Sequence, residues 1–287
     1  QVAPLLHCLR ADGAPARKGC PMKITSIDTV LVSFGNRNVP FVKVQTDEGI
    51  TGLGEAYSCG PDKATVEVIR DFALWLESRD PRDIEALYHL MFAGSRFPGG
   101  SVVGAAISGI EHALWDIAGK AAGLPVYRLL GGRCRDKVRV YQNPGGRTPE
   151  EMAENALKAI DRYGYTALKL SPLPPDYATL PWRKVVAESV RRCEAVRKAV
   201  GDAIDIGIDP HAKVFEPALA IELCRALEPM RPFFVEEPLR PENRPALALV
   251  REHVSVPIAT GEMLYTRYEF RDLLALQGQL RCEIVTA

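Results

Sequence analysis

The sequence lacks an excess of charge of either sign. Its 287 residues include 36 lysines and arginines and 36 aspartates and glutamates, so the formal net charge is zero. A balanced charge gives no long-range attraction toward nucleic acid or an anionic membrane. The sequence also lacks an apolar run long enough to cross a bilayer. We therefore expect a protein without a nucleic-acid or membrane partner.

Cysteine pairs of the kind that hold zinc are missing as well. The seven cysteines form neither a CxxC pair nor a disulfide-like framework, and they are scattered over Cys8, Cys20, Cys59, Cys134, Cys193, Cys224 and Cys282. Zinc bound through sulfur is therefore not expected. Reduced thiols in a cytoplasmic protein are the default interpretation.

Residues 1–21 show neither helical nor strand periodicity. Their apolar part is too short for a signal peptide and lacks its usual flanks. We interpret this segment as a disordered or non-native leader and exclude it from the fold.

Residues 22–135 combine a strand pattern with a helix pattern. Residues 22–34 and 39–57 alternate as strands, and Asp47-Glu48-Gly49 predicts the tight turn of a hairpin. Gly123 marks the end of a helix. Helical periodicity precedes it in three segments, residues 63–76, 81–92 and 102–122. An antiparallel sheet followed by consecutive helices is typical of an α+β domain.

Residues 136–287 alternate short apolar strands with helices. The predicted strands are residues 138–143, 166–171, 205–210, 233–238, 257–262 and 282–287. The predicted helices are residues 149–163, 183–200, 217–227, 245–254 and 267–277. This alternation indicates a parallel α/β fold, and acids at the strand tips favour a (β/α)₈ barrel. A Gly-rich dinucleotide fingerprint is absent, which weakens the open-sheet alternative. Six strands do not close such a barrel, so we expect a partial barrel, truncated after its sixth strand.

Three of these strands end in an acidic residue. Asp209, Glu236 and Glu262 are 27 and 26 residues apart, which leaves room for a helix and two loops between neighbours. Because parallel strands end on one rim, the three carboxylates are expected to converge, where they suit a hard cation such as Mg²⁺. The alternative is that the three acids are unrelated and each caps the helix that follows it. This alternative explains a single acid better than it explains three acids at regular spacing. Glu237, beside Glu236, is expected to point away and meet a lysine or arginine.

Three further polar residues are expected on the same rim. Lys169 and Ser171 face one side of their strand. A lysine there neutralises a substrate carboxylate or acts as a base once desolvated, unless it is simply solvated at the strand end. His211, two residues beyond Asp209, is placed to give or take a proton, unless loop groups satisfy it.

Several motifs occur together in one order: WDIAGKAAGLPVYRLLGG (115–132), ALKLS (167–171), IDPH (208–211), VEEP (235–238) and IATGE (258–262). In this combination the chain resembles the enolase superfamily, specifically its mandelate racemase/muconate lactonizing enzyme group, over nearly all of residues 22–287. The resemblance implies an α+β capping domain over a modified (β/α)₇β barrel, with Mg²⁺ held by Asp209, Glu236 and Glu262. It also implies abstraction of the proton α to a carboxylate, since a divalent cation stabilises the charge that develops there.

The chain departs from many members of this group at the second barrel strand. They carry Lys-x-Lys, whereas here Ser171 follows Lys169, so a two-base racemase of the Lys/His type is disfavoured. His211 resembles the histidine that helps the β-hydroxyl leave in sugar-acid dehydratases of the galactonate dehydratase type. In that type the base is a histidine on the seventh strand, oriented by an aspartate at the sixth. Both would fall beyond Ala287.

Loops of the first domain set specificity in this group. Here the candidates are residues 35–40 and 95–101, in which Arg37 and Arg96 would bind hydroxyls or a carboxylate of a polyol acid. The alternative interpretation, that each arginine is simply an exposed loop residue, has at least as much support. The loop at 171–182 carries Tyr177 and Trp182, which would either wall the site or support a subunit contact.

The predicted function is that of a Mg²⁺-dependent hydro-lyase that dehydrates an aldonate-type, galactonate-like sugar acid to a 2-keto-3-deoxy product. Lys169 would contact the substrate carboxylate, and His211 would assist departure of hydroxide. The expected partners are a small carboxylate substrate and further copies of the chain in a homo-oligomer. The alternatives are a sugar-lactone cycloisomerase, an epimerase or racemase of the same fold, an inactive truncated barrel and, with little support, a sugar-binding module.

Overall fold

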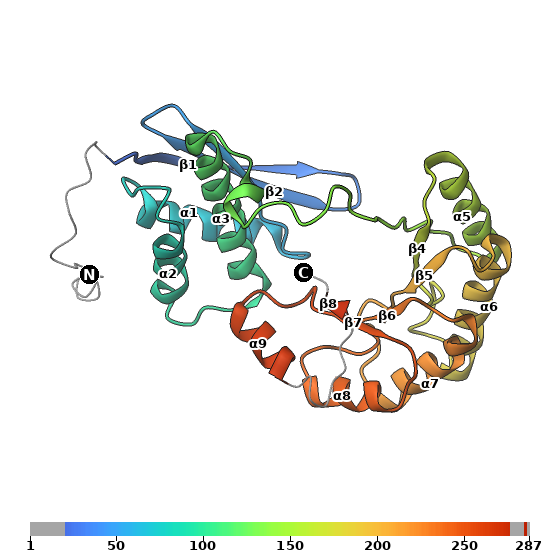
Figure 1. Ribbon diagram of the computed structural model, residues 1–287. Coiled ribbons are helices and arrows are strands. Elements are labelled where there is room, and N and C mark those ends of the chain that lie inside the picture. The colour runs from blue at the N-terminus through green and yellow to red at the C-terminus, as the bar shows by residue number, and fades with distance from the viewer. Residues whose placement is uncertain (1–20, 276–283, 286–287) are drawn as a thin grey trace. The chain divides into compact units, whose positions relative to one another are not determined.

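The computed structural model describes residues 21–275 and 284–285, and Figure 1 shows its elements. The chain divides into two compact units, residues 1–134 and 135–287, and each has its own hydrophobic core. The predicted leader lies outside the described residues except for its last position. Among the described helices, none combines the length and the apolar character needed to cross a membrane.

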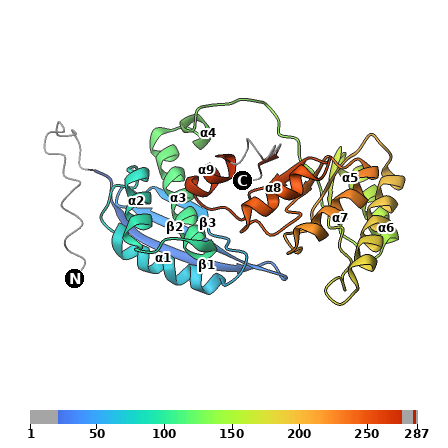
Figure 2. The same cartoon turned by 90° about the horizontal axis from the view of Figure 1, so that it is seen from below.

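The first unit is a three-stranded antiparallel sheet with helices packed against it (Figure 2). The strands lie in the order β1-β2-β3, and the predicted hairpin turn joins the second to the third, with Gly49 in a left-handed conformation (φ 77°). Its elements are β1 (Ile24–Ser33), β2 (Asn38–Thr46), β3 (Thr51–Glu55), α1 (Asp62–Leu76), α2 (Ile84–Gly94), α3 (Gly100–Ala122) and the short α4 (Val126–Leu129).

Helix α3 approaches β3 closely because two glycines remove the side chains that would separate them. A Cβ atom on Gly52 would lie 2.0 Å from the carbonyl oxygen of Ala113, and one on Gly54 would lie 1.9 Å from that of Gly109. No side chain fits into such a gap. The helix is therefore held directly against the backbone of the strand.

Two charged residues of the 115–132 motif fasten the same helix to the same strand. Asp116 accepts a hydrogen bond from the backbone N–H of Leu53 (2.9 Å), and Lys120 donates to the carbonyl of Thr51 (2.7 Å). The two side chains also pair with each other at 2.7 Å. This part of the motif is explained by packing of the first unit.

The second unit is a parallel sheet in the order β4-β5-β6-β7-β8, with helices α5 to α8 on its outer side (Figure 1). Its elements are α5 (Pro149–Tyr163), β4 (Ala167–Leu170), α6 (Trp182–Val200), β5 (Asp205–Ile208), α7 (Pro217–Leu227), the 3₁₀ turn η2 (Glu228–Met230), β6 (Phe234–Glu236), α8 (Arg244–Glu252), β7 (Ile258–Thr260), α9 (Arg267–Ala275) and β8 (Ile284–Val285). Spatial order equal to chain order is the arrangement of a barrel wall. The predicted fold class, an antiparallel α+β unit followed by a parallel α/β unit, is confirmed.

The first predicted barrel strand, residues 138–143, is not a regular strand. Its only ladder contact among the described residues is a parallel bridge between Gln142 and Leu168. Val138 and Val140 are 73% and 58% exposed. Within the described part of the chain, Val138 and Val140 are thus left uncovered, and the segment forms no ladder beyond this bridge.

Local capping signals decide how well helix ends could be predicted. The bounds of α5 agree with the prediction because the Thr148 side chain accepts a hydrogen bond from the first turn and Gly164 ends the helix at φ 68°. Helix α2 begins at Ile84, three residues later than predicted. The Asp80 carboxylate accepts a hydrogen bond from the backbone two residues on, which keeps that stretch in a turn.

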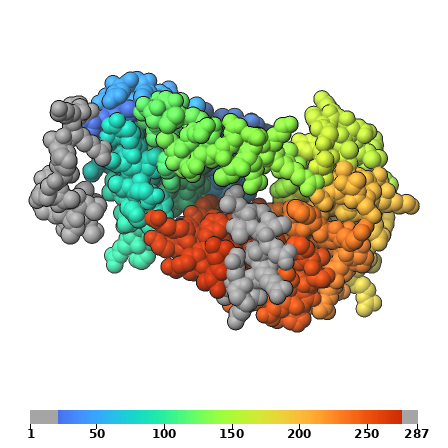
Figure 3. Space-filling model, viewed as in Figure 1, coloured from blue at the N-terminus to red at the C-terminus, as the bar shows by residue number. Residues whose placement is uncertain are grey.

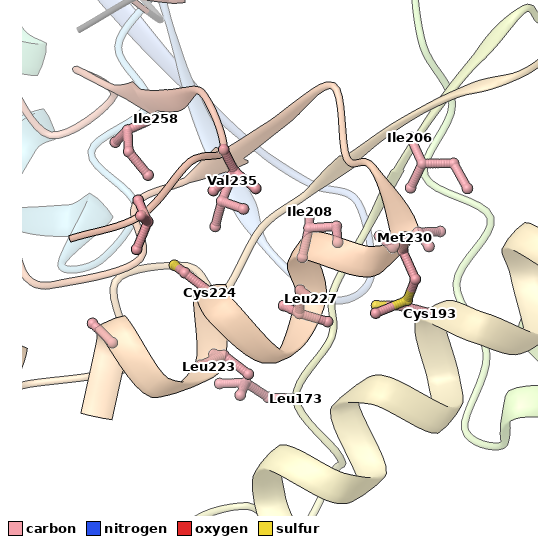
Figure 4. Packing of buried hydrophobic residues seen from close by; sticks show 14 of the residues in the cluster. Leu173, Cys193, Ile206, Ile208, Leu223, Cys224, Leu227, Met230, Val235 and Ile258 are labelled. Carbon is pink, nitrogen blue, oxygen red and sulfur yellow. The ribbon is translucent and has the colours of Figure 1, made fainter. Parts of the chain in front are cut away.

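The core of the second unit lies between its strands and helices, and Figure 4 shows part of it. Two of its members are the thiols of Cys193 and Cys224, and burial raises the pKa of each to about 12. These two cysteines are thus packing groups without ready thiolate character. The helices α6 to α8 form the outer surface of this unit, coloured yellow to orange in Figure 3.

Candidate active site

Asp209 and Glu236 meet at the C-terminal ends of the neighbouring strands β5 and β6. They are 0% and 2% exposed. Lys169 on β4 completes a triad, because its Nζ lies 2.7 Å from Asp209 Oδ2 and 3.0 Å from Glu236 Oε2. Lys169 and Glu236 are 67 residues apart in the sequence, and the parallel register of β4, β5 and β6 brings them together with Asp209 at one rim.

The charges of this triad depend on one another. Burial raises the pKa of Glu236, the nearby charges of Asp209 and Glu262 raise it further, and Lys169 opposes them. Burial works to lower the pKa of Lys169, but the two carboxylates outweigh it and the net shift is upward. Lys169 is therefore an ammonium ion at neutral pH, so in this state it neutralises the protein's own carboxylates and is not poised as a base.

His211 stands on the same rim in a tight turn. Its backbone N–H donates to Asp209 Oδ1 (2.7 Å), and its ring Nε2 lies 3.2 Å from Asp209 Oδ2. The backbone of His211 is left-handed, with φ 57°. Its other ring nitrogen, Nδ1, lies 3.0 Å from the carbonyl oxygen of Asp209, and the side chain is 41% exposed. The ring is accessible to a bound molecule.

Glu262 does not join Asp209 and Glu236. It stands two residues beyond the end of β7, after Gly261 (φ 132°), and it is exposed. Its charge nevertheless contributes to the raised pKa of Glu236. Within residues 21–275 and 284–285, no three histidines, cysteines or acids form a group that could hold a metal ion. A ligand set shared by all three acids stays a prediction.

Asp209 and Glu236 by themselves have the donor chemistry of a site for a hard cation. Asp209 Oδ2 is buried and accepts no hydrogen bond of regular geometry in spite of its two charged neighbours. Two buried carboxylates side by side are costly unless a positive charge compensates them, and here Lys169 supplies it. Two oxygen donors of this kind suit Mg²⁺.

The environment of Glu237 differs from the one expected. Among the described residues it pairs with no lysine or arginine. It is 0% exposed, and its Oε1 accepts hydrogen bonds from Thr260 Oγ1 and the Gly261 N–H, both at 2.9 Å. Burial raises its pKa to about 7. Strand alternation failed here because β6 ends at Glu236 and Glu237 is left-handed (φ 41°), so side chains no longer alternate.

Two tyrosines lie beside the charged residues of the rim. The Tyr141 ring centroid is 5.5 Å from Lys169 Nζ, and that of Tyr177 is 5.4 Å from the Nζ of Lys213 on the loop after β5. Tyr177 therefore leans toward the rim, which favours the interpretation of its loop as a wall of the site. Trp182 instead donates to a glutamate on α7 at 2.9 Å. Tyr141 belongs to the segment predicted as a strand, and its sequence context carries no signal for a place beside Lys169.

The remaining candidates for substrate binding are Arg37, Arg96 and Ser171. Arg37 lies over the ring of Tyr57 at 5.5 Å, and Arg96 lies over its neighbour Phe97 at 5.4 Å. Both arginines are exposed and belong to the first unit, whereas Ser171 is half-buried directly after β4. Their roles toward a substrate stay predictions.

The two units match two parts of one family. Residues 15–131 match the mandelate racemase/muconate lactonizing enzyme N-terminal domain, and residues 151–281 match the enolase C-terminal domain-like family. An enolase from Pantoea ananatis with bound D-gluconate and magnesium is 30% identical and has a TM-score of 0.79, with 89% of this chain and 69% of that one covered. The chain belongs to the mandelate racemase/muconate lactonizing enzyme family of the enolase superfamily.

Similar members of this family include acid-sugar dehydratases. The D-galactonate dehydratase of Variovorax paradoxus is 38% identical over 257 residues, which are 90% of this chain and 66% of that protein. An enolase from Agrobacterium radiobacter with bound sodium and L-malate is also 38% identical, with a TM-score of 0.83 over 89% of this chain and 65% of that one. This chain therefore spans just under two thirds of the length of these relatives.

Proposed function

We propose that this chain carries the cation- and acid-bearing part of a Mg²⁺-dependent hydro-lyase. The substrate is an aldonate-type sugar acid, and the product is a 2-keto-3-deoxy acid. The observation that carries the proposal is the triad of Asp209, Glu236 and Lys169 with His211 on the same rim. The similarity to D-galactonate dehydratases and to an enolase with bound D-gluconate and magnesium supports the choice of substrate class.

The carboxylates of Asp209 and Glu236 would hold the cation, and Glu262 is the candidate for a third ligand. When bound, Mg²⁺ would stabilise the negative charge that develops on the substrate carboxylate as the α-proton leaves. A bound ion would add to the compensation that Lys169 gives these two buried carboxylates.

Lys169 and His211 then have distinct roles. Lys169 lies on the same rim as the two carboxylates and would bind the substrate carboxylate as a cation. His211, whose side chain is 41% exposed, would donate a proton from a ring nitrogen to the β-hydroxyl, which leaves as water. The α-proton would pass to a base, for which the resemblance implies a histidine on the seventh barrel strand. Loss of this proton and of the β-hydroxyl leaves an enol, which becomes the 2-keto-3-deoxy acid by tautomerisation. Atoms balance as substrate equals product plus water.

The test is turnover of a panel of acid sugars by the protein expressed from its complete reading frame. Aldonates, uronates and their lactones are incubated with Mg²⁺, and 2-keto-3-deoxy acids are measured as semicarbazones. We expect a keto product from at least one aldonate, about 10²- to 10⁴-fold less product with His211→Asn, and none in EDTA. Products without a new carbonyl group would support a cycloisomerase or epimerase. Turnover that continues in EDTA would contradict the proposed cation.

A further inference from the structure

The backbone of Glu237 connects two neighbouring loops of the site. Its carbonyl oxygen accepts a hydrogen bond from Ala212 N (3.0 Å), directly after His211. Its own N–H donates to the carbonyl of Ala259 in β7 (2.9 Å). Glu237 therefore links the turn that carries the proposed acid to the next strand of the sheet.

The side chain of Glu237 reaches the loop that follows this strand. Its Oε1 accepts hydrogen bonds from the hydroxyl of Thr260 and the amide of Gly261, both at 2.9 Å. Gly261 immediately precedes Glu262, and it has a φ of 132° that favours glycine. The carboxyl group thus determines where the chain turns before the candidate third ligand.

Three residues with side chains hold left-handed backbone conformations around these contacts. The φ values are 57° for His211, 52° for Ala212 and 41° for Glu237. Such a conformation is strained for a residue with a side chain and persists only where the surroundings enforce it. The hydrogen bonds of Glu237 are among the contacts that enforce it.

The carboxyl group of Glu237 has no other evident purpose in this position. It is 0% exposed, and its Oε2 accepts no hydrogen bond from the part of the chain that the structure describes. Among the described residues no lysine or arginine pairs with it. A buried carboxyl without such a partner is less favourable than an apolar side chain of the same size. What the carboxyl provides is the pair of hydrogen bonds to Thr260 and Gly261.

We infer that Glu237 is a positioning residue. It fixes the positions of the turns that carry His211 and Glu262 relative to Glu236. The inference rests on the proposed function, because that function makes these three residues parts of one site. Glu237 acts through its neighbours and does not itself contact substrate or cation. Without its carboxyl group, the turn at Gly261 is released and Glu262 loses its place relative to the triad.

The test compares Glu237→Ala with Glu237→Gln in the full chain. Glutamine keeps an oxygen that accepts both hydrogen bonds, whereas alanine leaves the Thr260 hydroxyl and the Gly261 amide unpaired. We expect Glu237→Ala to weaken binding of Mn²⁺, the probe for the cation site, about 10- to 100-fold in titration calorimetry. Hydrogen exchange at the Gly261 amide, followed by NMR, should also become faster. Glu237→Gln should restore both properties.

Two further variants separate positioning from stability. Thr260→Val removes one of the two donors with little change of volume, so an intermediate loss of Mn²⁺ affinity is expected even if Glu237→Ala fails to fold. Val196→Ala removes buried methyl groups in α6, away from these loops, and serves as the control. It should lower the melting temperature but leave Mn²⁺ affinity unchanged.

The outcomes distinguish this inference from the proposed function. Wild-type Mn²⁺ affinity and wild-type Gly261 protection in Glu237→Ala would overturn the positioning role, as would equal losses in the Val196→Ala control. A wild-type protein that binds Mn²⁺ but yields no keto acid would count against the dehydratase only. If the wild type binds no Mn²⁺, exchange at Gly261 still decides whether Glu237 holds the turn.

Discussion

Replacement of Lys169 by methionine removes the ammonium group between two buried carboxylates and keeps much of the side-chain length. The Nζ atom lies 2.7 Å from Asp209 and 3.0 Å from Glu236, and the Lys169 side chain is only 14% exposed. Removal of one partner from a buried ion pair costs about 3–5 kcal/mol, because an uncompensated charge stays buried. For a chain of this length, that corresponds to a fall in melting temperature on the order of 10 °C.

The size of this loss should depend on cations and on pH. A divalent cation at the same carboxylates supplies the missing charge, so Mg²⁺ should raise the melting temperature of Lys169→Met more than that of the wild type. Lys169 is also the group that lowers the pKa of Glu236. Without it that pKa rises further, and the folded state then binds a proton more readily than the unfolded state. The stability deficit should therefore shrink as the pH falls toward 5.

Thermal unfolding followed by circular dichroism, in EDTA and then in Mg²⁺, measures these effects. The matched control is Lys158→Met on α5, where the lysine pairs with Glu154 at 2.6 Å but both side chains are 65% exposed. A surface pair of this kind contributes about 0–1 kcal/mol. If Lys169→Met unfolds in EDTA at the same temperature as the control, the two carboxylates do not depend on Lys169 and the reasoning from the triad is refuted.

Three other changes follow from particular contacts. The pKa of Glu237 is raised from 4.5 to about 7, so the free energy of unfolding in EDTA should fall by up to about 3 kcal/mol as the pH rises through this window. Glu237→Gln should abolish that fall in urea titrations, and an unchanged slope would contradict the assignment. Gly207→Ala should cost about 1–3 kcal/mol because its Cβ would lie 2.5 Å from the Phe234 ring, and an unaltered urea midpoint would count against this packing. Asp209→Asn should eliminate the rise in melting temperature with Mg²⁺ in scanning fluorimetry, whereas a persisting rise would place the ion elsewhere.

Much of the fold could be predicted because its signals are local. A proline at the start and a glycine at the end define α5, and the bounds of α7 follow from apolar periodicity within one short window. The alternation of strands and helices set the order of the parallel sheet, and acids at the strand tips marked Asp209 and Glu236 as neighbours. The strand predicted at 138–143 is wrong because, among the residues that the structure describes, Val138 and Val140 stay exposed in spite of the apolar pattern.

The sequence by itself determined which residues stand at the ends of the strands, since periodicity and turn residues act within about one helix or one strand length. Tertiary structure alone decided that Lys169 neutralises the two acids, that Glu237 bonds to the next loop, and that Glu262 remains exposed. Those outcomes depend on register between strands and on left-handed backbone at the strand ends. Both are set by contacts between segments distant in the chain.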